Sequence, residues 1–412
     1  MADRKRKEEL AREIHQFILE KVQDDNEISD QEIQENIEEY VLKIGHTTYL
    51  SVQEKEELIK EVFNSVRKLD VLQELLEDGE ITEIMVNGYQ HIFIEKEGCI
   101  FPYEKSFTNK EKLEDVIQQI VSKVNRMVNE ANPIVDVRLT DGSRVNIVLP
   151  PVALNGPIVT IRKFPETPIS MDRLIEIGSV TGEVVTFLKK LVRSKYNILI
   201  SGGTGSGKTT FLNALSQYIP EDERIITIED SAELQLQKIP NLVRLEVRNA
   251  NVEGKNEITI RDLMKSALRM RPDRVILGEV RDAAACELLN VMNTGHDGSL
   301  SSAHANSPKD MLNRLETLVL TGMGNIPLQA VRSQIASALD IVIQLGRLRD
   351  KSRHVLEIAE VAGMENGEIK VVPLYVFQEE GEDENGRIKG KLVATDKTLL
   401  HQEKLITAGI SL

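Results

Sequence analysis

Residues 202–209 read GGTGSGKT, and this stretch decides the fold of the domain around it. Gly202 and Gly207 stand at the Walker A spacing, and Lys208 and Thr209 follow directly. Glycines here let backbone amides turn toward phosphate oxygens, because no side chain obstructs the approach. The lysine offers a cation to the β- and γ-phosphates, and the threonine hydroxyl can ligate Mg²⁺. The stretch predicts a site for ATP and Mg²⁺ formed by Gly202, Gly203, Thr204, Gly205, Ser206, Gly207, Lys208, Thr209 and Thr210.

The segments on either side of this loop match the structure that it requires. Residues 198–200 form a short apolar run before it, and residues 210–215 have the composition of a helix after it. Such a helix points its positive end at bound phosphates. Further apolar runs at 224–229 and 274–277 alternate with helical stretches, as in α/β domains with a mostly parallel sheet. We therefore expect an α/β fold, rather than a chance glycine-rich turn before a helix.

Two acidic side chains end apolar runs of the same domain. Glu229 follows Ile226-Thr227-Ile228, and Glu279 follows Val275 to Gly278. Hydrolysis of a nucleoside triphosphate needs an acidic group near Mg²⁺ and a group that positions water. Ligands of open α/β sheets bind at the carboxyl ends of the strands. Either residue alone could be a helix N-cap or an exposed strand end, but together they predict a shared nucleotide site.

The composition limits the other functions that the chain could have. The chain has 412 residues, of which 41% are hydrophobic and 28% charged, enough for packed cores. We find no apolar run long enough to span a membrane and no secretory signal, and therefore expect a cytoplasmic protein. The two cysteines, Cys99 and Cys286, are far apart, which excludes a disulfide framework and a cysteine-rich zinc site. A net charge of −15 and an aromatic content of 4% argue against a nucleic-acid partner.

The first half of the chain reads as two parts. Residues 1–76 are strongly acidic, and their apolar residues follow a helical spacing in three stretches, the last from about 52 to 76. They predict a small helical bundle, whose acidic surface either docks a partner or is simply solvated. Residues 77–164 alternate like strands around a helix at 110–128, and Asn87-Gly88 favours a tight turn. This part is predicted to be an α+β module.

The second half of the chain reads as a linker, a domain and a tail. Two prolines within 165–170 predict a stiff linker. The α/β domain is expected to cover residues 171–376. Residues 377–412 are polar and glycine-containing, and are expected to form a tail with a last helix near 399–406.

These motifs resemble the secretion ATPase superfamily of type II and type IV secretion systems and type IV pili. Four boxes of that family occur here in order: the Walker A box at 202–209, the aspartate box at 229–233, an atypical Walker B box ending in Gly278-Glu279, and a histidine box at 294–307. The stretches ITEIMVNG (81–88) and DVRLTDGSR (136–144) also resemble its N-terminal module. The resemblance implies a RecA-like P-loop NTPase domain behind an α+β module and a helical N-terminal extension.

Within the superfamily the chain most resembles CpaF-type ATPases, which assemble tight-adherence (Flp) pili. The stretches ITEIMVNG and IEDSAELQL and the charged helical extension carry this resemblance. Type II secretion ATPases carry a tetracysteine zinc loop in the C-terminal domain, whereas only Cys286 lies in that half of this chain.

The resemblance also implies roles for single residues. Glu229 would be the base or water-orienting carboxylate, and Glu279 would hold Mg²⁺ through a water molecule. His304 would sense the γ-phosphate and His296 would support it. The family works as a homo-hexamer in which arginines of the N-terminal module complete a neighbour's site, a description that fits Arg138, Arg144 and Arg162. The alternative for these arginines is a solvated strand face.

The expected function is therefore a hexameric motor that hydrolyses ATP to power assembly or retraction of a tight-adherence pilus. It would push a platform protein of the inner membrane, so that any membrane contact is made through partners at the inner face. A VirB-type ATPase that powers macromolecule export shares the same boxes and remains an alternative. A RecA-like nucleic-acid motor and a nucleotide-regulated scaffold with little turnover are further alternatives.

Overall fold

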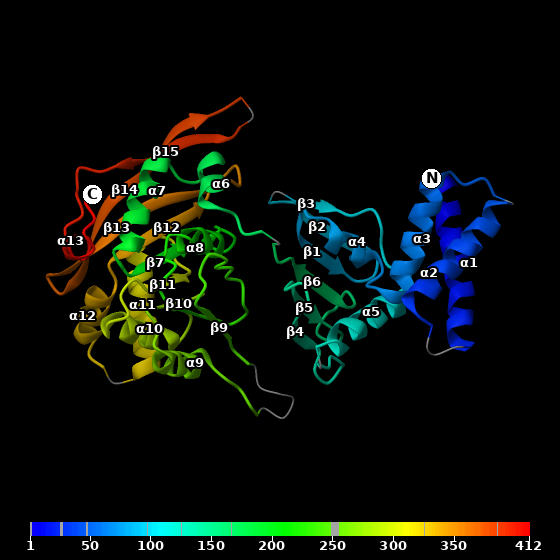
Figure 1. Cartoon of the computed structure of the whole chain (residues 1–412), viewed down its shortest axis with the longest axis horizontal. Helices are drawn as coiled ribbons and strands as arrows, with labels where there is room; N and C mark the ends of the chain where they lie inside the picture. The colour runs from blue at the N-terminus through cyan, green and yellow to red at the C-terminus, as the bar shows by residue number, and fades with distance from the viewer. Residues whose placement is uncertain are drawn as a thin grey trace. The chain divides into compact units, whose positions relative to one another are not determined.

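The structure is a computed structural model of the whole chain, and it divides into two compact units, Met1–Glu166 and Thr167–Leu412 (Figure 1). The residues that it describes are 2–24, 28–46, 48–96, 98–124, 126–165, 167–248, 255–324, 326–384 and 386–412. Glu166 of the expected linker lies outside these ranges. The division of the chain into five parts stays a prediction. Among the helices within the described ranges, none has the length and apolar composition of a membrane-spanning segment.

The first unit begins with a bundle of three helices, α1 (Ala2–Asp24), α2 (Asp30–Gly45) and α3 (Val52–Arg67). Ser29 and Ser51 start α2 and α3 with complete capping boxes, because each serine exchanges hydrogen bonds with a glutamate three residues on. The helices bury the apolar positions that their spacing predicted, among them Ile14, Ile18, Ile33, Ile37 and Val41.

The helix expected over 52–76 is in fact two helices. It is interrupted after α3, where Asp70 has a φ of 53°, and continues as α4 (Val71–Glu77). The break has a tertiary cause, because Leu69, Leu72 and Leu75 pack into the core of the α+β module rather than into the bundle. The helical pattern of the sequence is continuous across this point, so the spacing could not reveal it.

The α+β module is a sheet covered by a helix. Its strand order is β3-β2-β1-β6-β5-β4, and all neighbours are antiparallel: β1 (Ile81–Asn87), β2 (His91–Lys96), β3 (Cys99–Pro102), β4 (Ile134–Arg138), β5 (Arg144–Val148) and β6 (Ile158–Arg162). Gly88 has a φ of 69° in the turn that Asn87-Gly88 predicted. The helix α5 (Lys110–Ser122) packs Leu113, Ile117 and Ile120 into this core and ends earlier than expected.

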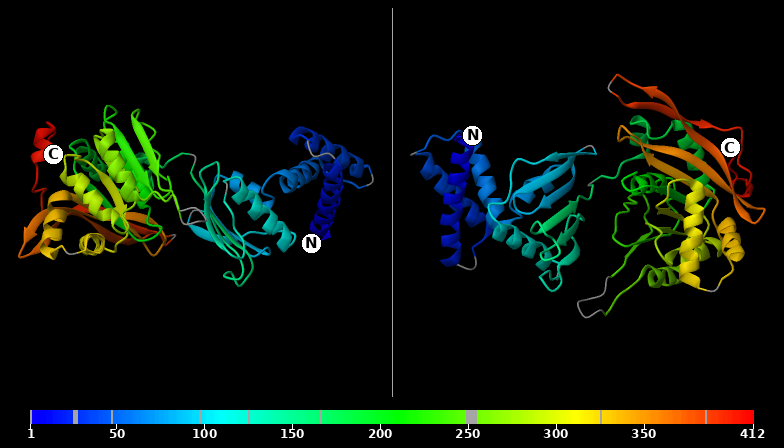
Figure 2. Two further views of the ribbon diagram at one scale, coloured as in Figure 1. Left: turned by 90° about the horizontal axis from the view of Figure 1, so that it is seen from below. Right: turned by 180° about the vertical axis from the view of Figure 1, so that it is seen from behind.

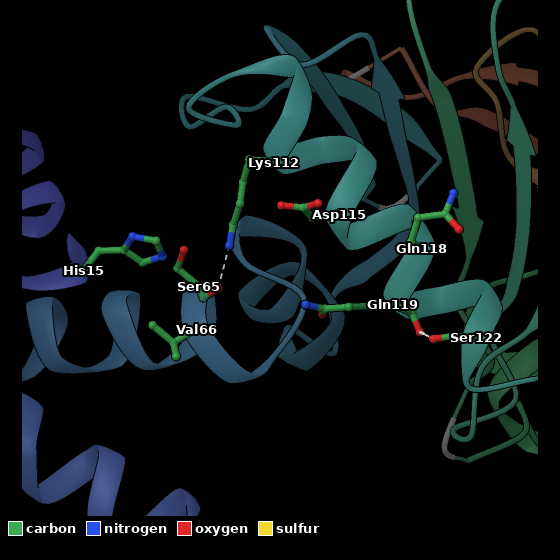
Figure 3. A pocket seen from close by; sticks show the side chains of 8 residues that line it. All are labelled: His15, Ser65, Val66, Lys112, Asp115, Gln118, Gln119 and Ser122. Carbon is green, nitrogen blue, oxygen red and sulfur yellow. Dashed lines mark hydrogen bonds between the residues drawn. The ribbon is translucent and has the colours of Figure 1, made fainter. Parts of the chain in front are cut away.

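A polar cavity of about 550 Å³ lies where α1 and α3 of the bundle meet α5 of the module (Figure 3). The Lys112 Nζ donates a hydrogen bond of 2.7 Å across it to the Ser65 carbonyl oxygen. His15 also lines the cavity, and burial, with the charge of Lys112 as a second cause, lowers the pKa of its imidazole. The junction between bundle and module is therefore polar at this point.

The second unit contains the expected α/β domain. Its strands follow the order β15-β14-β13-β12-β7-β11-β10-β8-β9, parallel from β12 to β9 and antiparallel from β12 to β15. Their bounds are β7 (Ile198–Gly202), β8 (Ile225–Glu229), β9 (Leu242–Glu246), β10 (Arg274–Leu277), β11 (Leu300–Ala303), β12 (Ile341–Arg347), β13 (Arg353–Glu365), β14 (Glu368–Glu382) and β15 (Ile388–Ala394). The fold class is confirmed, since the central strands read as short buried apolar runs.

Helices cover both faces of this sheet (Figures 1 and 2). One face packs against α6 (Met171–Glu176), α7 (Gly182–Arg193), α8 (Lys208–Ser216) and α13 (Glu403–Thr407). The other packs against α9 (Ile260–Ala267), α10 (Ala284–Asn293), α11 (Pro308–Met323) and α12 (Leu328–Ala338). The boundary expected at 376/377 falls inside β14, and residues after it supply β15 and α13. The buried Glu360 carboxylate of β13 fixes the segment before α13, because it accepts hydrogen bonds from the amides of Leu400 and His401.

Candidate active site

The loop at 202–209 joins β7 directly to α8. Gly205 and Gly207 have φ values of 70° and 91°, a conformation that side chains disfavour. A Cβ on Gly202 would stand 2.5 Å from the Ser206 Oγ and 2.8 Å from the Leu345 carbonyl oxygen. The Ser206 hydroxyl closes the loop by donating to the Gly203 carbonyl oxygen at 2.8 Å. This is a cradle that a Cβ would fill, followed by a helix N-terminus, and it fits a polyphosphate.

The remaining loop residues take the places that this role requires. Gly203 and Thr204 are exposed at the tip of the loop, while Thr209 and Thr210 are partly buried in the first turn of α8. Lys208 is buried, and its Nζ donates to the carbonyl oxygens of Gly202 and Gly203 at 3.1 and 2.9 Å. The ammonium group is therefore folded back onto the loop that it follows.

His304 lies beside Lys208 because β11 pairs with β7 and ends one residue before it. Its Nδ1 is 3.2 Å from the Lys208 Nζ, and its Nε2 is 3.1 Å from the Glu279 Oε1. Burial and then the charge of Lys208 lower the pKa of His304, and both causes favour the neutral ring. An ammonium can only donate, so Nδ1 must accept, and the proton is assigned to Nε2, which donates to Glu279.

Glu279 follows β10, and both of its carboxylate oxygens are engaged. The Oε1 accepts from His304, and the Oε2 accepts from the Arg281 Nη2 at 2.7 Å. Burial opposes the charge of Glu279, but the hydrogen bond and charge of Arg281 outweigh it and lower its pKa. The Nη1 of Arg281 also lies 3.5 Å from the Asp230 Oδ2. Sequence reasoning gave Arg281 no role, although a cation two residues after the acid was a visible signal.

Glu229 ends β8 and is 3% exposed. Its Oε2 accepts from the amides of Glu233 and Leu234 at 2.7 and 2.9 Å, whereas its Oε1 is buried with no hydrogen-bond partner in the described part of the chain. Burial raises the pKa of this carboxyl to about 7. Gly278 makes the room, since a Cβ there would stand 2.9 Å from the Glu229 Cγ. A buried carboxylate oxygen of this kind fits a water molecule that donates to it.

The residues present also fit Mg²⁺. The hydroxyl of Thr209 and the carboxylate of Glu279 are oxygen donors of the kind that Mg²⁺ prefers, next to a cradle for phosphates. His296 is not part of this cluster. It precedes β11, whereas His304 follows it, so the two histidines lie at opposite ends of the strand. The Thr294 Oγ1 is 3.5 Å from the His296 Nδ1.

The three predicted arginines lie in the first unit, and the register of its sheet brings them together. Arg138 on β4 pairs with Arg144 on β5, which pairs with Arg162 on β6. Directly opposite residues project from the same face of a sheet, so the three form a row, which we call the arginine row. Glu83 of β1 pairs with Arg162 at its end. Like charges opposite each other destabilise a sheet, and an anion bound to the row would relieve that cost.

Most of the chain matches a known family of proteins. Residues 66–396 match the family described as Type II/IV secretion system protein. The chain is 33% identical over 311 residues to a putative conjugal transfer protein of Mycobacterium tuberculosis, covering 74% of this chain and 87% of that protein. It is 32% identical over 318 residues to the type IV secretion system protein VirB11 of Brucella suis, covering 70% and 88%.

A solved structure supports the fold independently. The pilus retraction motor PilT with bound ADP aligns with a TM-score of 0.51 at 18% identity, covering 80% of this chain and 83% of that chain. At that identity the likeness concerns the fold alone. The match over residues 66–396 covers most of the chain, so the chain belongs to the type II/IV secretion system protein family.

Proposed function

We propose that this chain hydrolyses ATP at the 202–209 loop and converts the energy into work for a secretion or pilus machine. The observation that carries the proposal is the cluster in which Lys208 contacts His304 and His304 contacts Glu279, together with the buried Glu229, whose Oε1 has no hydrogen-bond partner in the described part of the chain. The loop with its cation Lys208, the two carboxylates and the histidine come from four segments, which lie at the carboxyl ends of the parallel strands β7, β8, β10 and β11. They supply the positioning and charge stabilisation that phosphoryl transfer needs.

In the proposed reaction Glu229 orients the attacking water through its Oε1 and takes up a proton from it. A pKa of about 7 suits this task, because the carboxyl can exchange a proton near neutral pH. Lys208 leaves the carbonyl oxygens of Gly202 and Gly203 and stabilises charge on the β- and γ-phosphates. Thr209 and Glu279 would hold Mg²⁺, which when bound neutralises charge on the phosphates.

His304 couples these groups in the proposed mechanism. Its Nδ1 accepts from Lys208, so withdrawal of Lys208 toward the phosphates leaves that nitrogen without its donor. Its Nε2–H acts on Glu279, one of the two Mg²⁺ ligands proposed here. The ring therefore responds to the arrival of the γ-phosphate, and this would make it a sensor rather than a base.

We further propose that the chain works as a homo-hexamer and that the arginine row completes the site of a neighbouring subunit. The row supports this, because three arginines that lie opposite one another in neighbouring strands favour a bound anion. A cavity of about 450 Å³ beside His304, lined by Asp310, Asn313 and Arg314, offers room for an incoming side chain. A site shared between subunits would couple hydrolysis to relative motion of the two units.

The expected machine is a tight-adherence pilus, driven through a platform protein at the inner face of the cell membrane. The stretches ITEIMVNG and IEDSAELQL and the acidic helical extension support this choice. Export of macromolecules is the second candidate, favoured by the identity of about a third to VirB11 and to conjugal transfer proteins. Prepilin and prepilin peptidase genes beside the gene would favour the pilus, and their replacement by conjugation genes would favour export.

The test of the proposed function is ATP turnover measured against protein concentration, together with mass by light scattering. We expect turnover per chain to rise as the mass grows from 46.3 kDa toward six times that value. No turnover in any assembly state would overturn the proposal. Stimulation of turnover by added DNA would instead favour a nucleic-acid motor.

A mixing experiment tests the shared site. Chains with Arg138→Ala and chains with Glu229→Ala should each be inactive, because each lacks one half of every site. In mixed hexamers some sites combine an intact arginine with an intact Glu229, and an equal mixture should regain about a quarter of the wild-type rate. Mixed hexamers that remain inactive, with mixing demonstrated by mass, would exclude a role for Arg138 in the neighbouring site.

A further inference from the structure

Two arginines of the second unit, Arg347 and Arg353, lie on the side of the 202–209 loop that faces away from His304. In the sheet, β7 lies between β11, which leads to His304, and β12. Next to β12, Arg353 starts β13, and its Nε donates a hydrogen bond of 2.8 Å to the Gly205 carbonyl oxygen. Its Cδ would be 3.6 Å from a Cβ placed on Gly207. The Arg353 side chain thus runs along the outside of the loop.

Arg347, the last residue of β12, lies directly opposite Arg353 in the ladder. Both side chains are exposed, and opposite residues project from the same face. Two like charges in this position are unfavourable unless an anion lies near them. Within the described ranges no carboxylate reaches Arg353, whereas Arg349 in the intervening turn is bound by Glu379 and Glu382. The strand register therefore keeps a positive pair beside the loop.

We propose that Arg353, assisted by the charge of Arg347, binds the ADP moiety of the nucleotide. This inference rests on the proposed function. The groups assigned to hydrolysis, Lys208, His304 and Glu279, lie at or beyond β7 on the β11 side, so the γ-phosphate belongs there. The ADP moiety must therefore extend from the loop in another direction. On the β12 side, Arg347 and Arg353 provide positive charge for its phosphates. A guanidinium has five N–H donors, and the bond to Gly205 uses one of them.

Such a contact has a distinct kinetic consequence. The ADP moiety is present in substrate and in product, so the arginine stabilises the bound ground state and the transition state about equally. Loss of the Arg353 contact should raise KM for ATP and lower the affinity for ADP, with a much smaller effect on kcat. A residue that merely supports the loop would behave differently, because a distorted loop misplaces Lys208 and lowers kcat.

Calorimetric titration of the full chain with Mg²⁺ and ADP, together with steady-state kinetics, tests the proposal. Arg353→Gln retains an amide donor for the Gly205 carbonyl oxygen but removes the charge. We expect this variant to bind ADP about tenfold more weakly and to have a KM for ATP that is raised to a similar extent, as for the loss of one charged hydrogen bond. Arg353→Lys should recover part of the affinity. The matched control is Arg349→Gln, which removes an exposed arginine of the same turn that is occupied by Glu379 and Glu382.

The outcomes separate this proposal from the proposed function. If Arg353→Gln binds ADP with wild-type affinity, whether or not its kcat falls, Arg353 does not bind the ADP moiety. The ATPase assignment would still stand in that case. Failure of the wild-type chain to bind ADP overturns both. If Arg353→Gln does not fold by circular dichroism, Arg347→Gln serves instead, and an ADP affinity equal to wild type in that variant counts against the positive pair.

Discussion

Lys208→Ala will reduce ATP turnover by about 10³-fold or more, to the background of the assay. The ammonium is the compact cation that the loop offers to the β- and γ-phosphates, and no other lysine in the described ranges contacts the loop carbonyl oxygens. The fold should survive, because the substitution removes a buried charge while the positive-φ glycines keep the backbone of the loop. Turnover is measured by phosphate release, and folding by circular dichroism.

The same variant has a spectroscopic consequence. Burial and, second to it, the charge of Lys208 lower the pKa of His304, so removal of that charge should raise the pKa toward the ordinary value, as measured by NMR titration of the imidazole. The control is Lys189→Ala, since Lys189 is an exposed lysine of α7 in the same unit. Turnover in Lys208→Ala comparable to the control would show that the site is misassigned.

The P-loop and its flanking strand and helix were predictable because their requirements are local. Gly205 and Gly207 have backbone conformations that favour glycine, and a short apolar run reads as a buried strand wherever it occurs. The interruption of the helix at Asp70 was not predictable, because it depends on which core Leu72 and Leu75 enter. The same holds for the end of the domain, since β14 and β15 are polar where they extend beyond the core.

The site residues divide in the same way. Glu229 and Glu279 could be placed at strand ends from the sequence, but the contact of His304 with both Lys208 and Glu279 depends on the pairing of β11 with β7. The arginine row depends on the register of three strands, which the alternation of residues does not specify. Arg353 was missed because it lies 148 residues from Gly205 in sequence. Pairing between strands that are distant in sequence brings these residues together, and local sequence patterns do not predict that pairing.

Glu229→Gln should lower turnover by about 10² to 10⁴-fold, the usual contribution of a positioned general base. In the wild type the base must be ionised, and its pKa is raised to about 7 by burial, so kcat/KM should rise with pH through a midpoint near 7. The amide keeps an oxygen that can accept from the amides of Glu233 and Leu234, and the local structure should persist. A pH-independent rate between pH 6 and 8 would contradict the assignment of Glu229 as the base.

The Glu229→Gln variant should lose activity but gain stability relative to the wild type at high pH. The folded pKa of Glu229 lies above the ordinary value of 4.5, so its protonated form stabilises the fold fully below pH 4.5, and this contribution is lost as the pH rises through 7. Glutamine is neutral at every pH. The Glu229→Gln variant should therefore match the wild type near pH 4.5 and exceed it at pH 8 by up to about 3 kcal/mol in the free energy of unfolding. Denaturant titrations at the two pH values measure this difference. A variant less stable than wild type at pH 8 would show that burial does not destabilise the ionised Glu229 carboxylate.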